Sequence, residues 1–439
     1  MNDGNRIGKR VSFITMGCAK NEVDTAHMAT RLALAGYEVV DDAEAADVVV
    51  VNTCSFIQAA TEESIDAILE ASDLDNVSGG GAHLVVTGCL PARYGKELEP
   101  TLPEVGDFIP CNEEDDIVSR LDSLFDIERI GTTTALEAPR FESGSCSTYV
   151  KISDGCDRFC SYCTIPYIRG RYHSFAEDEI EREVTGLIAC GSREIVLIAQ
   201  DTGRWGNDLE GAGTLASLLS GLAQRHPQTW FRVMYIQPEG VTDELIEAVR
   251  NHDNICSYFD IPFQHCNEQV LKRMNRKGSA DEFLALVERI RSRIPDATLR
   301  TTLIAGFPGE TEEQFEELCD FVENLEFDYV GVFPYSQEMP TRAGELDGQI
   351  DEEVKLERAQ RIRDIADGIS GVVIQQRVGK AMDVLVCGKE EDGQLYGRTQ
   401  SQAPDVDGVT FVDRGEVGQF VRCAIQDTLF YEMEGEVVS

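Results

Sequence analysis

Residues 149–163, YVKISDGCDRFCSYC, decide the fold of the central part of the chain. Residues 149–152 predict a buried strand, and the loop after it carries Cys156, Cys160 and Cys163 in the spacing CxxxCxxC. Further strands are predicted at residues 194–199, 231–235, 258–261, 299–304 and 329–333. Helices are predicted between them, for instance at residues 178–189, 242–251 and 312–325. Six strands alternating with helices over about 220 residues predict a partial (β/α) barrel, with catalytic loops at the C-terminal ends of its strands.

The N-terminal part repeats the alternation on a smaller scale. Strands are predicted at residues 11–16, 48–51 and 84–87, and helices at residues 22–35 and 59–71, with Gly36 as the C-cap of the first helix. This order predicts a parallel sheet flanked by helices, an αβα domain. Residues 137–147, rich in Pro, Gly and Ser, predict a linker to the barrel.

The sequence pattern changes after Gly368 from alternating strands and helices to short β-like runs. Short β-like runs at residues 383–387, 409–412, 420–425 and 429–433, separated by Gly and Asp turns, predict a small OB-like β-barrel. The fold is therefore expected to be α/β with three domains, at residues 1–136, 145–372 and 374–439.

Composition and charge narrow the functional classes. Of the 439 residues 42% are hydrophobic, which excludes disorder over the whole length. The 39 Lys and Arg face 79 Asp and Glu, a net charge of −40, and the last barrel has six cations among twelve acids. Such a chain is suited to a basic protein partner rather than to nucleic acid phosphates, although a solvated acidic surface explains the charge equally well. Its apolar runs are far shorter than the ~20 residues of a membrane span, so we expect a cytoplasmic protein without a membrane partner.

The Cys loop of the barrel points to metal chemistry. A structural zinc site needs a fourth ligand, for which Cys146 and His173 are candidates. A 4Fe–4S cluster held by three Cys leaves one iron open to a small molecule. Tyr162 is a flat side chain that can pack against an adenine, and Gly306 begins the segment GFPGE, where a tight turn would let the backbone approach a cofactor. Ordinary loop packing and a plain turn are the alternatives.

The first domain also contains a Cys triad. Cys18, Cys54 and Cys89 each follow a predicted strand, and the ends of parallel strands share one edge of a sheet. The three thiols are therefore expected to converge, without a disulfide in a reducing cytosol. Cys111 is a candidate substitute ligand. The isolated cysteines are expected to be packing residues: Cys190, Cys319, Cys387 and Cys423.

The motif CxxxCxxC, with an aromatic residue before its last Cys and a (β/α) barrel around it, resembles that of the radical S-adenosylmethionine enzymes. The resemblance implies a 4Fe–4S cluster on Cys156, Cys160 and Cys163 whose open iron chelates S-adenosylmethionine. One electron from the cluster then cleaves the cofactor to a 5′-deoxyadenosyl radical. Three arginines near the motif are candidates for holding a substrate carboxylate, with loop solvation or structural ion pairs as the alternative: Arg158, Arg169 and Arg171.

The whole chain is similar, domain by domain, to the methylthiotransferase family, whose members combine an auxiliary-cluster domain, a radical-SAM barrel and a C-terminal TRAM barrel. The resemblance implies a second 4Fe–4S cluster on Cys18, Cys54 and Cys89, and an external electron donor. One branch of the family modifies the β-carbon of an aspartate in ribosomal protein S12, and another modifies an adenosine in tRNA.

Four segments resemble the ribosomal branch, namely residues 17–21 (GCAKN), 153–157 (SDGCD), 198–202 (IAQDT) and 331–336 (GVFPYS). Glu22 departs from it, since that branch often has Leu there. The expected partner is ribosomal protein S12, free or in the small subunit, and not tRNA. A tRNA methylthiotransferase and a non-catalytic zinc-dependent binding protein are the competing hypotheses.

Overall fold

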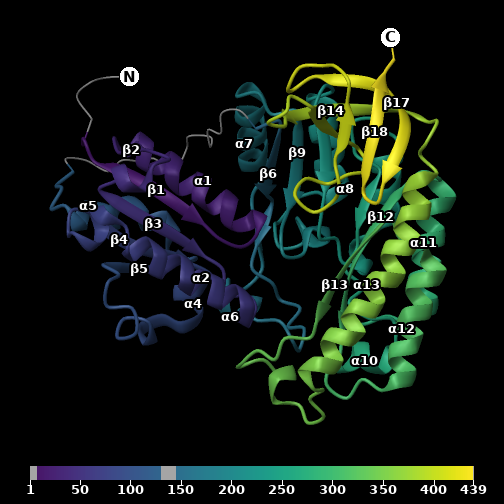
Figure 1. Cartoon of the computed structure of the whole chain (residues 1–439), viewed down its shortest axis with the longest axis horizontal. Coiled ribbons are helices and arrows are strands. Elements are labelled where there is room, and N and C mark those ends of the chain that lie inside the picture. Colours follow the sequence, from purple (N-terminus) through teal and green to yellow (C-terminus); the bar gives the residue numbers. More distant parts are fainter. Residues whose placement is uncertain (1–6, 130–144, 439) are drawn as a thin grey trace. The chain divides into compact units, whose positions relative to one another are not determined.

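The computed structural model describes residues 7–129 and 145–438, and the chain forms two compact units (Figure 1). The first unit contains the N-terminal domain together with residues 155–157 and 163–172 of the Cys loop region. The second contains residues 145–154, 158–162 and everything from 173 onward. Most of the linker predicted at 137–147 lies outside the described residues.

The first unit is built on a parallel five-stranded sheet, in the order β2-β1-β3-β4-β5. Apolar residues on one sheet face pack against α1 and α5, and those on the other face pack against α2 and α4. The predicted αβα domain is therefore confirmed. Its elements are β1 (Arg10–Thr15), α1 (Ala19–Leu34), β2 (Glu38–Val39), β3 (Val48–Thr53), α2 (Gln58–Ser72), α3 (Asp75–Ser78), β4 (His83–Gly88), α4 (Cys89–Tyr94), β5 (Asp107–Pro110) and α5 (Ile117–Leu124).

The second unit contains the predicted partial barrel. Its six strands form two parallel sheets, β10-β9-β6 and β11-β12-β13. Backbone hydrogen bonds join the two sheets, from Phe231 N to Asn254 O (2.8 Å) and from Ile236 N to Asp260 O (2.9 Å). The strands are β6 (Ser147–Lys151), β9 (Glu194–Ile198), β10 (Trp230–Val233), β11 (Tyr258–Asp260), β12 (Thr298–Ala305) and β13 (Tyr329–Pro334).

Helices cover the barrel, and each predicted helix is present. Thr311 and Thr242 start two of them, since their hydroxyls accept from the backbone N–H of Gln314 and Leu245. The helices of this unit are α7 (Glu177–Ala189), α8 (Leu215–Arg225), α9 (Asp243–Arg250), α10 (Glu268–Arg273), α11 (Ala280–Arg293), α12 (Glu312–Leu325) and α13 (Glu352–Gln375), while α6 (Ile165–Ile168) belongs to the first unit. A short hairpin, β7 (Ser153–Asp154) with β8 (His173–Ser174), flanks the Cys loop.

The chain ends in a closed five-stranded barrel, as predicted, in the order β14-β15-β16-β18-β17. Two details differ from the sequence expectation. The strand β15 was not expected, and residues 429–433 are not one strand, because Phe430 has φ of +52° and forms the turn between β17 and β18. The strands are β14 (Ala381–Lys389), β15 (Leu395–Thr399), β16 (Thr410–Val412), β17 (Phe420–Leu429) and β18 (Glu432–Val437).

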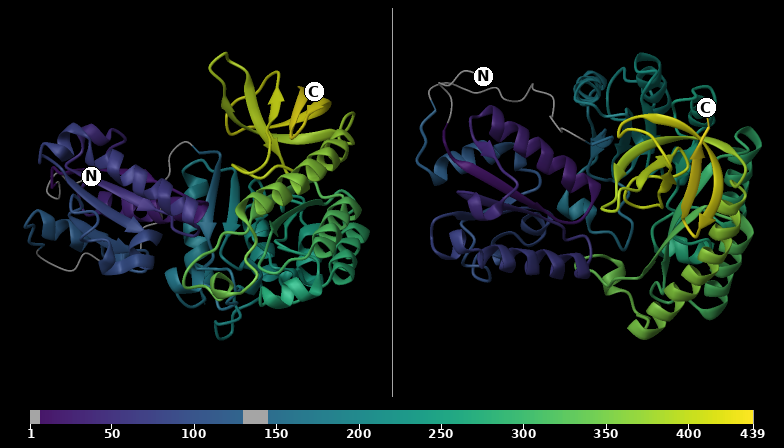
Figure 2. Two further views of the ribbon diagram at one scale, coloured as in Figure 1. Left: turned by 60° about the horizontal axis from the view of Figure 1, so that its bottom comes forward. Right: turned by 45° about the horizontal axis from the view of Figure 1, so that its top comes forward.

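This barrel packs against the N-terminal ends of the central strands (Figure 2). Arg398 of β15 pairs with Glu194, the first residue of β9, at 2.7 Å, and Arg232 pairs with the same carboxylate at 2.8 Å. Together these cations hold the pKa of the buried Glu194 at about 2, against its burial. Tyr258, the first residue of β11, donates to Asp407 at 2.7 Å. The C-terminal barrel therefore contacts the N-terminal ends of β9 and β11.

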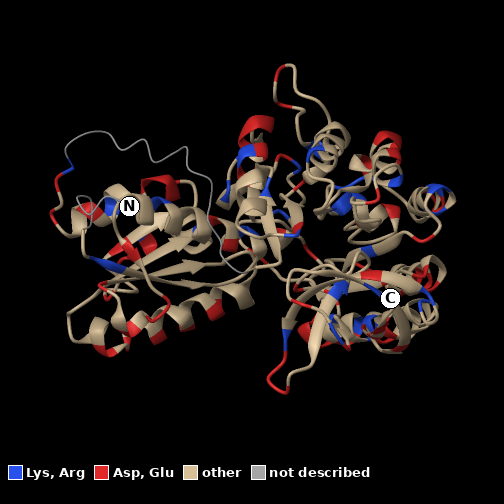
Figure 3. Ribbon diagram, turned by 90° about the horizontal axis from the view of Figure 1, so that it is seen from above, with Lys and Arg blue, Asp and Glu red and all other residues tan. Residues whose placement is uncertain are grey.

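Acidic residues are spread over helices and loops of both units, among fewer Lys and Arg (Figure 3). Within the described ranges, 7–129 and 145–438, no helix has both the length and the apolarity that a membrane span requires.

Candidate functional site

Four cysteines line one edge of the N-terminal sheet. Cys18, Cys54, Cys89 and Cys111 follow the C-terminal ends of β1, β3, β4 and β5, which are adjacent in that order. Parallel strands present these ends on one side, where α/β sheets bind ligands. All fourteen cysteines of the chain lie within the described residues, and none forms a disulfide.

Asn21 lies between thiols of the first triad, which consists of Cys18, Cys54 and Cys89. Its Oδ1 accepts weak hydrogen bonds from Cys18 Sγ at 3.9 Å and from Cys89 Sγ at 4.0 Å. Gly17 lies against Cys54, since a Cβ built on this glycine would be 3.0 Å from Cys54 Sγ. Gly17 also has φ of +93°, so this close approach requires glycine. The residues Gly17, Cys18 and Asn21 belong to the GCAKN segment, which here has a direct structural role.

The electrostatic environment differs among the four cysteines at this sheet edge. Burial raises the pKa of the Cys54 thiol to about 12, and the neighbouring Cys89 and Cys18 add to the effect. The pKa of Cys89 is lowered to about 7, because the Cys111 thiol hydrogen-bonds to it and Arg169 lies nearby. That hydrogen bond and burial raise the pKa of Cys111. The thiolate is the metal-binding form, and the contact with Cys111 favours that form at Cys89.

Arg169 ties the segment after Cys163 to this site. Its Nη2 lies 2.8 Å from Asn21 Oδ1 and 2.8 Å from Asp24 Oδ2. Thr164 adds a hydrogen bond to Phe56 O at 2.9 Å. Residues 163–172 therefore pack beside the first Cys triad, within one compact unit.

The three arginines near the Cys loop form structural ion pairs, which was the alternative weighed from the sequence. Arg169 pairs with Asp24, Arg158 pairs with Asp201, and Arg171 pairs with Asp157 at 3.0 Å. A bound carboxylate would have to compete with these acids.

The loop 156–163 is held by hydrogen bonds to neighbouring segments. Cys156 N donates to Gly170 O at 3.2 Å, and Gly155 has φ of +70° with no room for a Cβ, which would stand 2.2 Å from Arg171 O. On the barrel side, Arg276 donates to Cys160 Sγ at 3.8 Å. Cys156 and Cys163 belong to the first compact unit and Cys160 to the second.

The two predicted cofactor contacts have defined surroundings. Tyr162 is partly buried against the barrel core and lies near the charge of Arg276. Gly306 follows β12 with φ of +76°, so the expected tight turn is present. A Cβ on Gly306 would stand 2.4 Å from Lys355 Cγ, so the close approach there is to α13. Cofactor contact at Tyr162 and Gly306 stays a prediction.

Cys146, a candidate zinc ligand, has a different neighbour. Its sulfur accepts a hydrogen bond from the thiol of Cys387 in the C-terminal barrel, and this contact lowers the pKa of Cys146 to about 7. Cys387, expected to be a packing residue, is thus part of a thiol pair. Among residues 7–129 and 145–438, no three His, Cys, Asp or Glu side chains are arranged to hold a single metal ion. A 4Fe–4S cluster, by contrast, binds each of its thiolates at a different iron.

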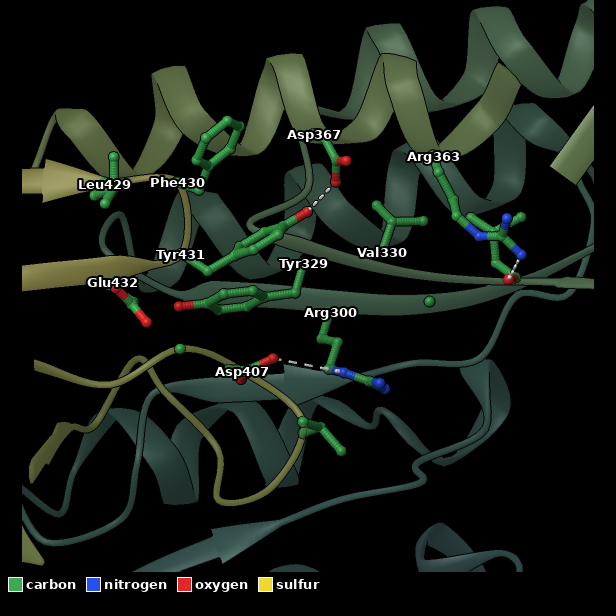
Figure 4. A pocket seen from close by; sticks show the side chains of 14 residues that line it. Arg300, Tyr329, Val330, Arg363, Asp367, Asp407, Leu429, Phe430, Tyr431 and Glu432 are labelled. Atoms are coloured by element: carbon green, nitrogen blue, oxygen red, sulfur yellow. Dashed lines mark hydrogen bonds and ion pairs between the residues drawn. The ribbon is translucent and has the colours of Figure 1, made fainter. Parts of the chain in front are cut away.

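One cavity was not foreseen from the sequence. It has a volume of about 710 Å³ and lies where β13 and α13 meet the β17–β18 turn (Figure 4). The rings of Tyr329 and Tyr431 stand 5.7 Å apart there, and Arg300 lies 3.7 Å from Asp407. No predicted site residue lines this cavity, so it is separate from the Cys sites.

Known structures share the fold. The chain superposes on a radical S-adenosylmethionine methyltransferase, TsrM from Kitasatospora setae, with a TM-score of 0.53 at 14% identity, covering 75% of this chain and 73% of that one. The cobalamin-dependent S-adenosylmethionine radical enzyme OxsB gives a TM-score of 0.52 at 12% identity, covering 82% of this chain and 56% of that one. At these identities the similarity concerns the fold alone.

Family models cover the three parts of the chain. Residues 10–109 match the uncharacterized protein family UPF0004, residues 150–322 match the radical SAM superfamily, and residues 378–438 match the TRAM domain.

Full-length relatives are closer. The ribosomal protein uS12 methylthiotransferase RimO of Clostridioides difficile (strain 630) is 42% identical, with 98% of this chain and 99% of the relative aligned. The RimO proteins of Alkaliphilus oremlandii and Geobacter sulfurreducens are each 41% identical, over 97% and 98% of this chain. With two Cys sites in the expected domains and this similarity over nearly its whole length, the chain belongs to the RimO family of radical-SAM methylthiotransferases.

Proposed function

We propose that this protein methylthiolates the β-carbon of an aspartate in ribosomal protein S12, free or in the small subunit. The observation that carries the proposal is the coexistence of two Cys sites in a chain about 40% identical to RimO proteins over nearly its whole length. The reaction takes place in the cytoplasm with an external electron donor. The functional domains are residues 1–136, 145–372 and 374–439.

Two 4Fe–4S clusters are part of the proposal. Cys156, Cys160 and Cys163 hold the one that binds S-adenosylmethionine, and the second is held by the first triad, Cys18, Cys54 and Cys89. Bound there, the clusters supply the electron that cleaves S-adenosylmethionine and the sulfur that is attached to the aspartate, and a second S-adenosylmethionine supplies the methyl group.

The chain's own residues prepare these sites. Asn21 contacts Cys18 and Cys89, Gly17 leaves room for Cys54, and Arg169 fixes the segment after Cys163 beside them. Arg276 donates to Cys160 and so stabilises a thiolate at that position. In the same loop region Tyr162 offers a flat face for the adenine of S-adenosylmethionine.

Charge supports a protein substrate over tRNA. Of the six cations in the C-terminal barrel, Arg377 and Arg398 are buried in ion pairs with Asp328 and Glu194 of the central barrel. Arg422 pairs with Asp383 at 3.1 Å. Because these three arginines already pair with carboxylates, few positive charges of the barrel are available to bind phosphates. A basic ribosomal protein instead meets an acidic surface that can steer its approach.

A competition assay tests the proposal. The reconstituted enzyme is incubated anaerobically with reductant, S-adenosylmethionine, S12 and unmodified tRNA together, and both substrates are analysed by mass spectrometry. We expect a methylthio group on one aspartate of S12 and unchanged tRNA, at a rate that falls as salt rises. Methylthioadenosine in the tRNA with unmodified S12 would refute the assignment.

A further inference from the structure

The row of thiols at the edge of the N-terminal sheet has one more member than the triad needs. Cys111 follows β5 as Cys89 follows β4, and these two strands are paired. Its backbone N–H donates to Gly88 O at 3.0 Å, which fixes Cys111 beside the residue that precedes Cys89. The thiols of Cys89 and Cys111 are then close enough to form a hydrogen bond.

The surroundings of Cys111 differ from those of a packing cysteine. Cys319, for comparison, is buried within the hydrophobic core of the barrel. Cys111 is partly exposed, and its Sγ lies 3.5 Å from Ile168 O, in the segment that Arg169 fixes beside the triad. It therefore shares the polar environment of the first triad.

We propose that Cys111 is a fourth, exchangeable thiolate ligand of the iron–sulfur cluster held by Cys18, Cys54 and Cys89. This inference rests on the auxiliary cluster of the proposed function. A triad leaves one iron without a protein ligand, and the Cys111 side chain is within reach of the site because it touches Cys89.

The step is a ligand exchange without oxidation or reduction. On binding, the Cys111 S–H bond breaks, its proton passes to solvent, and an iron–sulfur bond forms. When a sulfur donor of the hydrosulfide class binds instead, the bond from iron to Cys111 breaks and the thiol regains a proton. Cys111 thereby keeps the reactive iron closed until the sulfur donor arrives.

The experiment isolates the auxiliary cluster in full-length protein. All variants carry Cys156→Ala, Cys160→Ala and Cys163→Ala, and the background is compared with added Cys111→Ala, Cys111→Ser or Cys190→Ala. Cys190 is a matched control, since it is also partly exposed and lies at the end of α7, outside the site. After anaerobic reconstitution, Mössbauer spectra, titration with hydrosulfide and iron loss to a chelator are measured.

We expect four similar iron sites in the background and in Cys190→Ala, and one distinct iron in Cys111→Ala. Hydrosulfide should bind Cys111→Ala at least about tenfold more tightly, since it no longer competes with a thiolate, and this variant should lose iron faster. Cys111→Ser should fall between them. Identical spectra and hydrosulfide affinities with and without Cys111 would overturn the inference and leave the auxiliary cluster intact. Loss of all iron in the background would refute both the cluster and the inference.

Discussion

Arg169 and Asp24 form a buried ion pair, with Arg169 Nη2 2.8 Å from Asp24 Oδ2 and each side chain only 3% exposed. Asp24 lies on α1, the helix that begins directly after Cys18. Arg169 follows Cys163 by six residues. The same guanidinium donates to Asn21, whose Oδ1 receives the thiols of Cys18 and Cys89. Arg169 therefore joins the segment after Cys163 to the polar side chain between Cys18 and Cys89.

Arg169→Ala should destabilise the N-terminal unit strongly. It removes the guanidinium from the buried Asp24 carboxylate, and losing one partner of a buried ion pair typically costs ~3–5 kcal/mol in the free energy of unfolding. Urea unfolding of the apo-protein, followed by far-UV circular dichroism, measures the loss.

The control is Arg171→Ala. Arg171 also pairs with an aspartate, but its side chain is 75% exposed, so the variant should lose less than ~1 kcal/mol. Equal losses in the two variants would show that the buried pair with Asp24 does not stabilise this unit.

Gly155→Ala should prevent cluster assembly on the Cys loop. The new Cβ would meet Arg171 O at 2.2 Å, and the φ of +70° is unfavourable for alanine, so the backbone next to Cys156 must shift. Gly170→Ala is the matched control, since φ there is +76° but nothing lies within 4 Å of its Cβ. Iron content and cleavage of S-adenosylmethionine should fall only in Gly155→Ala. Full cleavage by that variant would mean that the loop geometry is not required.

Arg276→Gln should lower the reduction potential of the cluster on the Cys loop. Arg276 donates to Cys160 Sγ at 3.8 Å, and its positive charge favours the more negative, reduced cluster. We expect a shift on the order of 60 mV, which corresponds to about 1.4 kcal/mol for one electron. Redox titration followed by electron paramagnetic resonance measures it. Arg273→Gln is the control, because Arg273 donates to Gly309 O instead, and an equal shift there would contradict the role of Arg276.

Asp407→Asn should change the pH dependence of stability. Burial raises the pKa of Asp407 to about 6, above its ordinary value of 3.8, despite the nearby Arg300. The folded protein thus holds the proton more tightly, and wild-type stability falls as pH rises from about 4 to 6. Asparagine removes this cost and can still accept from Tyr258, so its stability relative to wild type should rise by up to ~3 kcal/mol over that range.

Tryptophan fluorescence during urea unfolding reports this change, since Trp230 packs on Phe420 of the C-terminal barrel. Asp405→Asn is the control, because Asp405 is an exposed carboxylate of the same loop. A relative stability of Asp407→Asn that stays constant from pH 4 to pH 7 would contradict the prediction.

The sequence predicted the architecture because its signals are local. The run Val48–Val51 and the alternation of strands and helices are explicit in the hydrophobic pattern, and each predicted strand of the two α/β domains is present. Short β15 and the turn at Phe430 were missed, since their place depends on barrel closure and not on a local pattern. The positions of the Cys residues at strand ends followed from the same logic.

Side-chain partners were less predictable. Nothing in the spacing of Cys146 and Cys387 indicates that their thiols meet, because the contact joins segments 241 positions apart through the packing of two barrels. Asn21 belongs to the GCAKN segment, but its contacts with Cys18 and Cys89 depend on the folded sheet edge. Arg169 was a candidate for holding a substrate carboxylate, and the structure shows the alternative, an ion pair with the chain's own Asp24.

The most direct test of the division of labour between the two Cys triads compares two triple variants in one anaerobic assay with S12. Replacing Cys156, Cys160 and Cys163 by Ala should halve the iron and abolish reductive cleavage of S-adenosylmethionine. Replacing Cys18, Cys54 and Cys89 by Ala should also halve the iron, leave cleavage measurable and leave S12 unmodified. Cleavage of S-adenosylmethionine by the first variant, or methylthiolated S12 from the second, would contradict the account.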